Sequence, residues 1–185
     1  GMFRDEPGSN VLAGAAHFYD TYECADGRFV AVASLEPEFY RLLVEKAGLD
    51  PERFAGHGFR LGTPPDEAAW AELKTELAAV MRTRTRDEWC RAMEGTDACF
   101  APVLGLSEAP DHPHNAARGT FTEVGGVMQN APAPRFSKTP PGEPSAPRPQ
   151  GADGREVLGL VGYSDAEIDA LAVAGSVVLR EESKS

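Results

Sequence analysis

The sequence predicts an α+β fold: a small domain of antiparallel hairpins packed on helices, followed by a proline-rich linker and short C-terminal helices. Two turn signals between apolar runs, at Asp26-Gly27 and Gly125-Gly126, predict the hairpins. Apolar residues at helical spacing between residues 37 and 93 predict the helices. The expected parts are a linker over 1–15, the small α+β domain over 16–136, the proline-rich linker over 137–150 and a C-terminal helical segment over 151–185.

The first hairpin is expected over residues 17–34. Residues 17–24 alternate loosely, and Asp26-Gly27 is well suited to a tight turn with positive φ. The second strand is apolar on both faces, so we expect a buried hairpin. A helix should begin at Pro37, where the missing N–H costs nothing, and end at Gly48.

Two more helices and a short strand follow. One helix is expected over residues 66–82, because large apolar residues recur there at helical spacing. The next begins at Thr85, whose partner Glu88 completes a capping box, and it should bury Trp89. Residues 99–104 are typical of a short strand.

The remaining elements are short. Residues 108–118 are expected to be irregular because of their prolines, and strands over 120–124 and 127–129 form the second hairpin. Prolines dominate 131–150, which predicts a semi-extended linker. The final helices, around 155–161 and from Ser164, are too short to fold alone and are expected to dock on a part absent from this chain.

The charge of the chain restricts its partners. There are 29 acidic and 18 basic side chains, a formal net charge of −11. Such a surface repels phosphates, which argues against nucleic acid as a partner. No apolar run approaches the roughly 20 residues of a membrane span, so no membrane insertion is expected.

The cysteines indicate a compartment. Cys24, Cys90 and Cys99 are odd in number and lack paired close spacing, which favours buried free thiols in a reduced cytoplasm over a disulfide framework. Gly1 before Met2 resembles the remnant of a cleaved tag, so the chain is expected to be part of a longer protein.

Few residues have the spacing of a known catalytic or metal site. His112 and His114 lie beside Asp111, but the proline between them and the lack of further ligands favour a polar loop over a metal centre. Cys99 has no basic partner nearby and is expected to be a small buried residue where a strand begins. No metal site is predicted.

Glu36 is the strongest candidate functional residue. It stands between an apolar strand and Pro37, at the N-cap of the expected helix, where Ser, Thr, Asp or Asn would cap better. A carboxylate at such a junction is well placed to orient a catalytic base. The alternative is a solvated Glu that merely benefits from the helix dipole.

Several runs together resemble the family III CoA-transferase superfamily, and most closely its α-methylacyl-CoA racemase branch. The runs are Ala25-Asp26-Gly27-Arg28-Phe29-Val30-Ala31-Val32, Leu35-Glu36-Pro37-Glu38-Phe39-Tyr40, Gly95-Thr96-Asp97-Ala98-Cys99-Phe100-Ala101-Pro102-Val103 and Gly162-Tyr163-Ser164-Asp165-Ala166-Glu167-Ile168. The chain departs from the family at Ala13, Ala15 and His17, where Asp, Gly and Pro are usual, so the acyl substrate stays open.

The resemblance implies a two-domain protein that interlocks as a homodimer, with a Rossmann-like large domain that binds CoA. This chain would supply the small domain, the return linker and final helices of the large domain, while the acid/base His and Asp lie upstream. Glu36 matches the family Glu that hydrogen-bonds that His. Leu35 and Tyr19, adjacent to Glu36 on the paired strands, are candidates to line the apolar acyl site.

The expected reaction is epimerisation of the C2 centre of 2-methylacyl-CoA thioesters in fatty acid metabolism, by proton abstraction and return through an enolate. It needs no cofactor beyond the CoA of the substrate. The alternatives are CoA transfer between carboxylic acids, and a non-catalytic module for dimerisation or substrate covering. The isolated chain is expected to be inactive.

Overall fold

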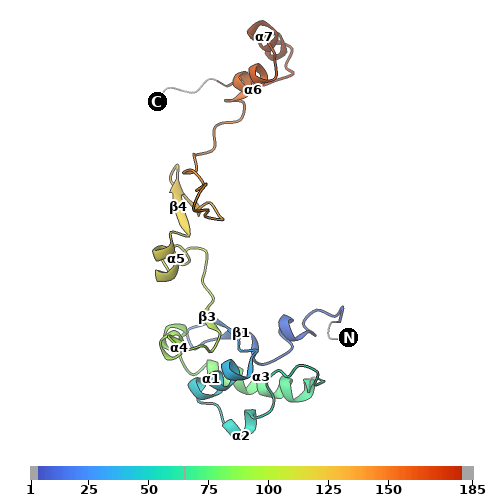
Figure 1. Ribbon diagram of the computed structural model, residues 1–185, viewed down its shortest axis with the longest axis vertical. Helices are drawn as coiled ribbons and strands as arrows, with labels where there is room; N and C mark the ends of the chain where they lie inside the picture. Colours follow the sequence, from blue (N-terminus) through green and yellow to red (C-terminus); the bar gives the residue numbers. More distant parts are fainter. Residues whose placement is uncertain (1–3, 65, 181–185) are drawn as a thin grey trace. The chain divides into compact units, whose positions relative to one another are not determined.

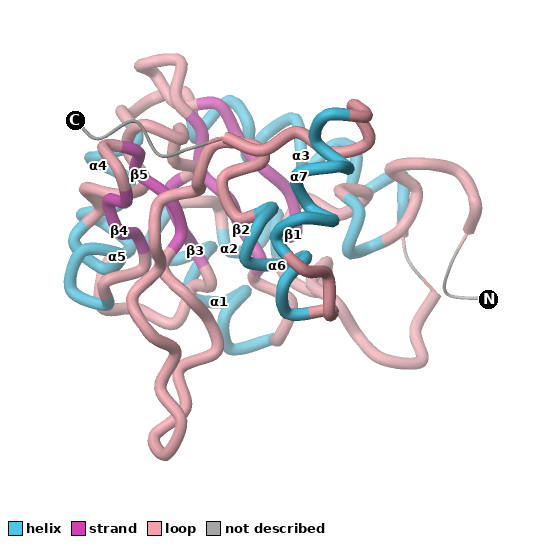
Figure 2. Tube along the Cα trace, turned by 90° about the horizontal axis from the view of Figure 1, so that it is seen from above, coloured by secondary structure: helices cyan, strands magenta, loops and turns pink. Residues whose placement is uncertain are grey.

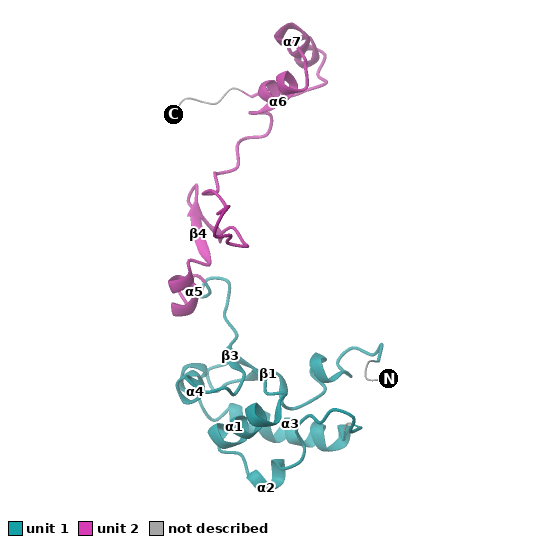
Figure 3. Ribbon diagram, viewed as in Figure 1, with its two compact units in different colours: residues 1–109 teal, residues 110–185 magenta. Residues whose placement is uncertain are grey.

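The computed structural model describes residues 4–64 and 66–180 (Figure 1). It divides into two compact units, Gly1–Ala109 and Pro110–Ser185 (Figure 3). The mixed α and β content with antiparallel hairpins confirms the predicted fold class. The division falls after Ala109, whereas the sequence analysis keeps 16–136 together; those domain ranges stay predictions.

Unit 1 is built on a three-stranded antiparallel sheet of order β1-β2-β3, whose strands lie side by side in Figure 2. Its elements are, in chain order, the 3-10 turn η1 (Val11–Ala13), β1 (Tyr19–Glu23), β2 (Phe29–Ala33), α1 (Pro37–Ala47), α2 (Pro51–Phe54), α3 (Glu67–Met81), α4 (Arg86–Met93) and β3 (Phe100–Pro102). In the ladder Tyr19 lies opposite Ala33, and Val32 opposite Phe100.

Local sequence signals explain most of these boundaries. Gly27 has a φ of 72° in the β1–β2 turn, and Gly48 ends α1 in the left-handed conformation, as predicted. Thr85 and Glu88 form the predicted capping box of α4. The helix α2 was not predicted: four residues are too few for a periodic pattern, and Asp50 forms it by capping two backbone N–H groups.

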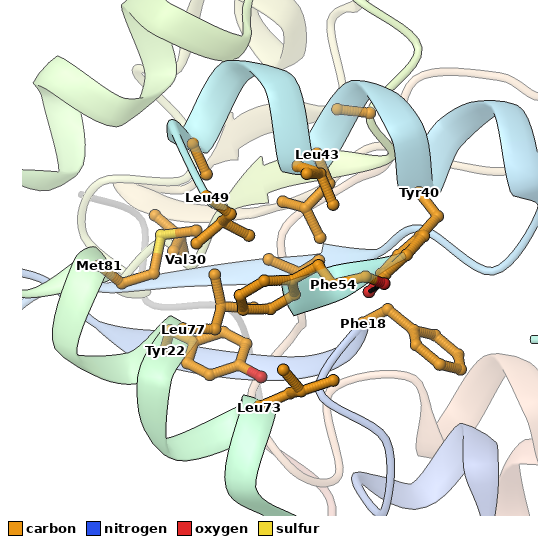
Figure 4. Packing of buried hydrophobic residues seen from close by; sticks show 14 of the residues in the cluster. Phe18, Tyr22, Val30, Tyr40, Leu43, Leu49, Phe54, Leu73, Leu77 and Met81 are labelled. Atoms are coloured by element: carbon orange, nitrogen blue, oxygen red, sulfur yellow. Dashed lines mark hydrogen bonds between the residues drawn. The ribbon is translucent and has the colours of Figure 1, made fainter. Parts of the chain in front are cut away.

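The core lies on one face of the sheet. Figure 4 shows Tyr22 and Val30 of the sheet, Leu43 of α1 and Leu77 of α3 pointing into one interior. The opposite face of β2 is only partly covered, and Phe29 is 44% exposed. The expectation of a hairpin buried on both faces is therefore wrong for the described chain, because the helices of unit 1 cover a single face.

Unit 2 contains a hairpin and three helices: α5 (Pro113–Arg118), β4 (Phe121–Val124), β5 (Val127–Asn130), α6 (Gly154–Leu160) and α7 (Asp165–Val173). The predicted hairpin and both C-terminal helices are confirmed. The expectation of irregular structure over 108–118 is wrong for its second half, because Pro113 occupies the first turn of α5 and Gly119 closes it in the left-handed conformation.

The C-terminal helices bury little of their own apolar surface. Arg155 of α6 forms ion pairs with Asp165 and Asp169, which hold the two helices together at their polar side. Leu160 and Val173 are 80% and 90% exposed. Within residues 4–64 and 66–180, no helix is both long enough and apolar enough to span a membrane.

Candidate functional site

One end of the three-stranded sheet brings together the residues singled out by the sequence. Tyr19 begins β1 opposite Ala33, the last residue of β2. Leu35 and Glu36 follow β2 after one residue, Ser34. Cys99 directly precedes β3, and its carbonyl accepts a hydrogen bond from Ala33 N–H at 2.9 Å. Three strands therefore deliver Tyr19, Leu35, Glu36 and Cys99 to one edge of the fold.

Glu36 lies at the N-terminal end of α1, as predicted, but its side chain does not cap the helix. It is the N-cap residue of α1, with an extended backbone (φ −73°, ψ 149°), and its side chain makes no capping hydrogen bond. The residue is exposed. Its backbone carbonyl accepts from Tyr40 N–H at 2.9 Å, so the helix is anchored through the backbone while the carboxylate stays available. A carboxylate in this state can accept a hydrogen bond from a group outside the described chain.

The backbone leading to Glu36 is fixed on two sides. Ser34 is fully buried, and its hydroxyl donates to the carbonyl of Ala98 at 2.5 Å. Its backbone N–H donates to the carbonyl of Phe18 at 2.9 Å. Glu36 thus leaves the sheet from a point tied both to the start of β1 and to the start of β3, which limits the positions its carboxylate can take.

Cys99 is a neighbour of Glu36 that the sequence reasoning misplaced. It is exposed, not buried, and it is the one described residue other than glycine with a positive φ, 48°. Partial burial of its thiol, followed by the negative charges of Glu36 and Asp97, raises the pKa of Cys99. The thiol is therefore protonated at neutral pH, which does not suit a nucleophile. The sequence pattern did not indicate that Cys99 is exposed. It did not indicate the left-handed backbone either, because Asp97-Ala98-Cys99 contains no glycine, the residue type that such a backbone favours.

Leu35 and Tyr19 lie near Glu36 in the chain and in the strand pairing. Both side chains are half-buried and pack against the core cluster. Their exposed parts lie at the same sheet end as Glu36, in agreement with the predicted adjacency. Whether they contact an acyl group stays a prediction.

His17 is the buried imidazole nearest in sequence to this site, and its environment makes it structural. Tyr40 O–H donates to the carbonyl of Phe54 at 3.0 Å, so Tyr40 accepts from His17 Nε2–H at 2.8 Å. Nδ1 has no hydrogen-bond partner in the described chain. Burial, followed by the charge of His57, lowers the pKa of His17 to about 3. The ring stays neutral at physiological pH and has no access to solvent, so it cannot exchange protons with a substrate.

The comparisons with known proteins bear on this arrangement. A sequence profile described as CoA-transferase family III matches residues 2–154, more than four fifths of the chain. The chain belongs to CoA-transferase family III. This family member is 41% identical over 171 residues to "Alpha-methylacyl-CoA racemase" of Mus musculus and 38% identical over 167 residues to the protein of that name in Homo sapiens.

The chain spans less than half the length of these curated relatives. The matches cover 91% and 87% of this chain but 43% and 41% of the two racemases. A more distant relative, "CaiB/baiF CoA-transferase family protein ZK892.4" of Caenorhabditis elegans, is 28% identical over 68% of the chain and 33% of its own length. The described site is therefore one part of what a full-length family member contains.

Solved structures agree on the fold. A crystal structure of Rv3272 from M. tuberculosis matches with a TM-score of 0.53 at 17% identity, over 69% of this chain and 34% of that one. A second structure of Rv3272 gives a TM-score of 0.53 at 19% identity, over 66% of this chain and 34% of that one. At this identity the likeness concerns the fold alone.

Proposed function

We propose that this chain is part of an α-methylacyl-CoA racemase, which epimerises the C2 centre of 2-methylacyl-CoA thioesters. The observation that carries the proposal is the Glu36 carboxylate, which is exposed after β2 and makes no capping hydrogen bond to α1. It lies in a chain that is 41% identical to a racemase over 171 residues. The full-length protein would act on acyl-CoA as a homodimer in the cytoplasm.

The chemistry assigns Glu36 a supporting role. The thioester carbonyl acidifies the C2 hydrogen, because the resulting carbanion delocalises as an enolate. One base removes the proton and an acid on the opposite face returns one, and both need protonation states held by neighbours. Glu36 is proposed to accept a hydrogen bond from an imidazole supplied by the rest of the protein, and so to act as a positioning residue. Tyr19 and Leu35 would line the acyl chain, and the reaction needs no cofactor.

There are two alternatives to the racemase function: CoA transfer between carboxylic acids, and a non-catalytic role. CoA transfer through a carboxylate nucleophile is the activity in the name of the family, and the relative from C. elegans carries that name at 28% identity. The racemases match at higher identity over more of the chain, which favours epimerisation. The isolated chain is proposed to be inactive and to serve only as a dimerisation and substrate-covering module.

Glu36→Gln in the full-length protein tests the proposal. The amide keeps the size and some hydrogen bonding but removes the charge that would hold an imidazolium. We expect kcat for C2 deuterium exchange of a single-enantiomer 2-methylacyl-CoA, followed by NMR in deuterated water, to fall on the order of 10- to 1000-fold. KM should change little, since the carboxylate is not proposed to bind the nucleotide. Glu38→Gln, an exposed charge in the first turn of the same helix, is the matched control and should behave as wild type.

A pH profile separates positioning from a general loss of structure. Without the carboxylate the imidazolium is less stable, so the acidic limb of kcat/KM should move to lower pH in Glu36→Gln. The 185-residue chain alone should show no exchange above a buffer control. Wild-type exchange in a normally melting Glu36→Gln protein would return Glu36 to the role of a solvated carboxylate, and CoA transfer without exchange would favour the transferase.

A further inference from the structure

Unit 1 contains a cavity that shares no lining residue with the Glu36 site. Its volume is about 700 Å³, within the range of small-molecule sites. One wall is the N-terminal segment from Arg4 to Val11, and the other is the loop from Gly56 to Pro64 that precedes α3. The reaction proposed above uses none of these residues.

The N-terminal wall is closed into a loop and tied to α3 through Arg4. The side chain of Asn10 accepts from Arg4 N–H at 2.8 Å and donates to Arg4 carbonyl at 2.9 Å, which closes residues 4–10 into a loop. The Arg4 guanidinium then reaches across to both carboxylate oxygens of Glu67 in α3. Residues 4–11, which we call the strap, thus lie over the cavity. One ion pair, which can open, holds the strap to α3.

The opposite wall is apolar and rigid. Trp70 is 5% exposed, and its indole N–H donates to the carbonyl of His57 at 2.9 Å, which fixes the plane of the ring. Phe59 on this wall is half-buried against the core cluster, as is Val11 on the N-terminal wall. A Cβ on Gly58 would lie 2.9 Å from the Tyr40 ring, so the loop packs too closely there for any side chain. The Trp70 hydrogen bond and the close approach of Gly58 to Tyr40 therefore hold this wall against the rest of unit 1.

The lining of the cavity holds two arginines and two carboxylates, Arg4 and Arg60 with Asp66 and Glu67, in a chain whose formal net charge is −11. Asp66 is engaged by Ala69 N–H at 3.1 Å as the cap of α3, and Glu67 is engaged by Arg4. Arg60 is exposed and forms no ion pair with any residue that the structure describes. Its guanidinium is therefore the one lining cation among the described residues that is free to pair with an anionic ligand, since Arg4 already pairs with Glu67.

From the free cation and the aromatic wall we propose that the cavity binds an amphipathic carboxylate, a ligand with one anionic head and an unbranched apolar body. The head pairs with Arg60, whose planar guanidinium matches a carboxylate in two parallel hydrogen bonds. The apolar body lies against Phe59 and Trp70 beneath the strap. Binding is non-covalent, and no residue of the Glu36 site takes part.

Titration of the 185-residue chain with decanoate, below its micelle concentration, tests the site. The chain has two tryptophans, Trp70 in the cavity wall and Trp89 fully buried with its indole bonded to Met81 carbonyl at 2.8 Å. In the ¹⁵N-labelled chain the Trp70 indole signal should shift and saturate, while that of Trp89 stays in place. Calorimetry then gives the affinity of each variant.

Arg60→Gln should weaken decanoate binding roughly tenfold or more, the scale of one charge-assisted hydrogen bond. The matched control is Arg41→Gln, which removes an exposed guanidinium from α1, away from the cavity lining. The affinity of Arg41→Gln for decanoate should equal that of the wild-type chain. The affinity of the wild-type chain for decanol, which lacks the carboxylate, should be as low as that of Arg60→Gln for decanoate. The proposal is overturned by the absence of a saturable Trp70 shift, by equal shifts at both indoles, or by equal affinity in the two arginine variants.

Discussion

Ser34 is the residue whose loss should loosen the Glu36 site most directly. Ser34→Ala removes one hydroxyl and leaves the buried carbonyl of Ala98 without its 2.5 Å hydrogen bond. Both residues are fully buried, so water does not replace the lost donor. Leaving a buried acceptor unsatisfied costs about 1–3 kcal/mol. The Ala33–Cys99 backbone bond remains, so we expect about 2 kcal/mol with the fold retained.

Urea unfolding followed by tryptophan fluorescence measures this loss, because both tryptophans lie in unit 1. At a denaturant slope of about 2 kcal/mol/M, the midpoint should fall by roughly 1 M. Ser9→Ala is the matched control, since the Ser9 hydroxyl donates to Glu6 carbonyl at 2.7 Å in an exposed turn. It should shift the midpoint by less than about 0.3 M. Equal midpoints for the two variants would refute the idea that Ser34 fixes the strand end before Glu36.

Two further predictions concern the chain by itself. The folded-state pKa of His17, about 3, lies below the unfolded value of about 6.5, so the unfolded chain takes up this proton first. The contribution of His17 to the free energy of unfolding should therefore be fully present above pH 6.5. It should be lost towards pH 3 by up to about 1.4 kcal/mol per pH unit. In His17→Gln the urea midpoint should depend less on pH between pH 6.5 and 5 than in the wild-type chain. Unchanged pH dependence in that variant would contradict a buried neutral ring. Residues 137–150, which form no helix or strand and are exposed apart from Pro144, should exchange amide hydrogens before β1 and β2 do. Slow exchange there would contradict the linker interpretation.

The fold was predictable wherever a local signal decides the structure. The Asp26-Gly27 turn, the Thr85–Glu88 capping box and the helical spacing around Trp70 each reappear in the structure. One miss arises where the deciding contact is not local, and another where a local signal was misinterpreted. The open face of β2 follows from where the helices pack, which strand alternation does not encode. The α5 helix was missed because Pro113 was taken to interrupt regular structure, while it occupies the first turn.

The site was predictable to the level of the residue, not of its surroundings. A Glu before Pro at a strand end was enough to single out Glu36, because a poor cap at a helix start is visible in sequence. Glu36 and Cys99 are separated by 62 residues, and their proximity depends on the pairing of β2 with β3 and on a left-handed backbone at Cys99, a residue type that rarely adopts it. The cavity between Arg4 and Arg60 joins segments with no common sequence pattern.

Within the described part of unit 1, α1 is the one α-helix whose N-cap side chain accepts no backbone hydrogen bond. The other three α-helices of the described unit begin with a residue whose side chain accepts a backbone hydrogen bond: Asp50, Asp66 and Thr85. Such a cap contributes about 1 kcal/mol, and α1 forgoes it. The helix dipole would favour a short Asp at the same place equally well, and Asp would also cap. Stability therefore does not account for a longer carboxylate here, whereas the role proposed for Glu36, a hydrogen bond to a donor beyond the helix end, would account for it.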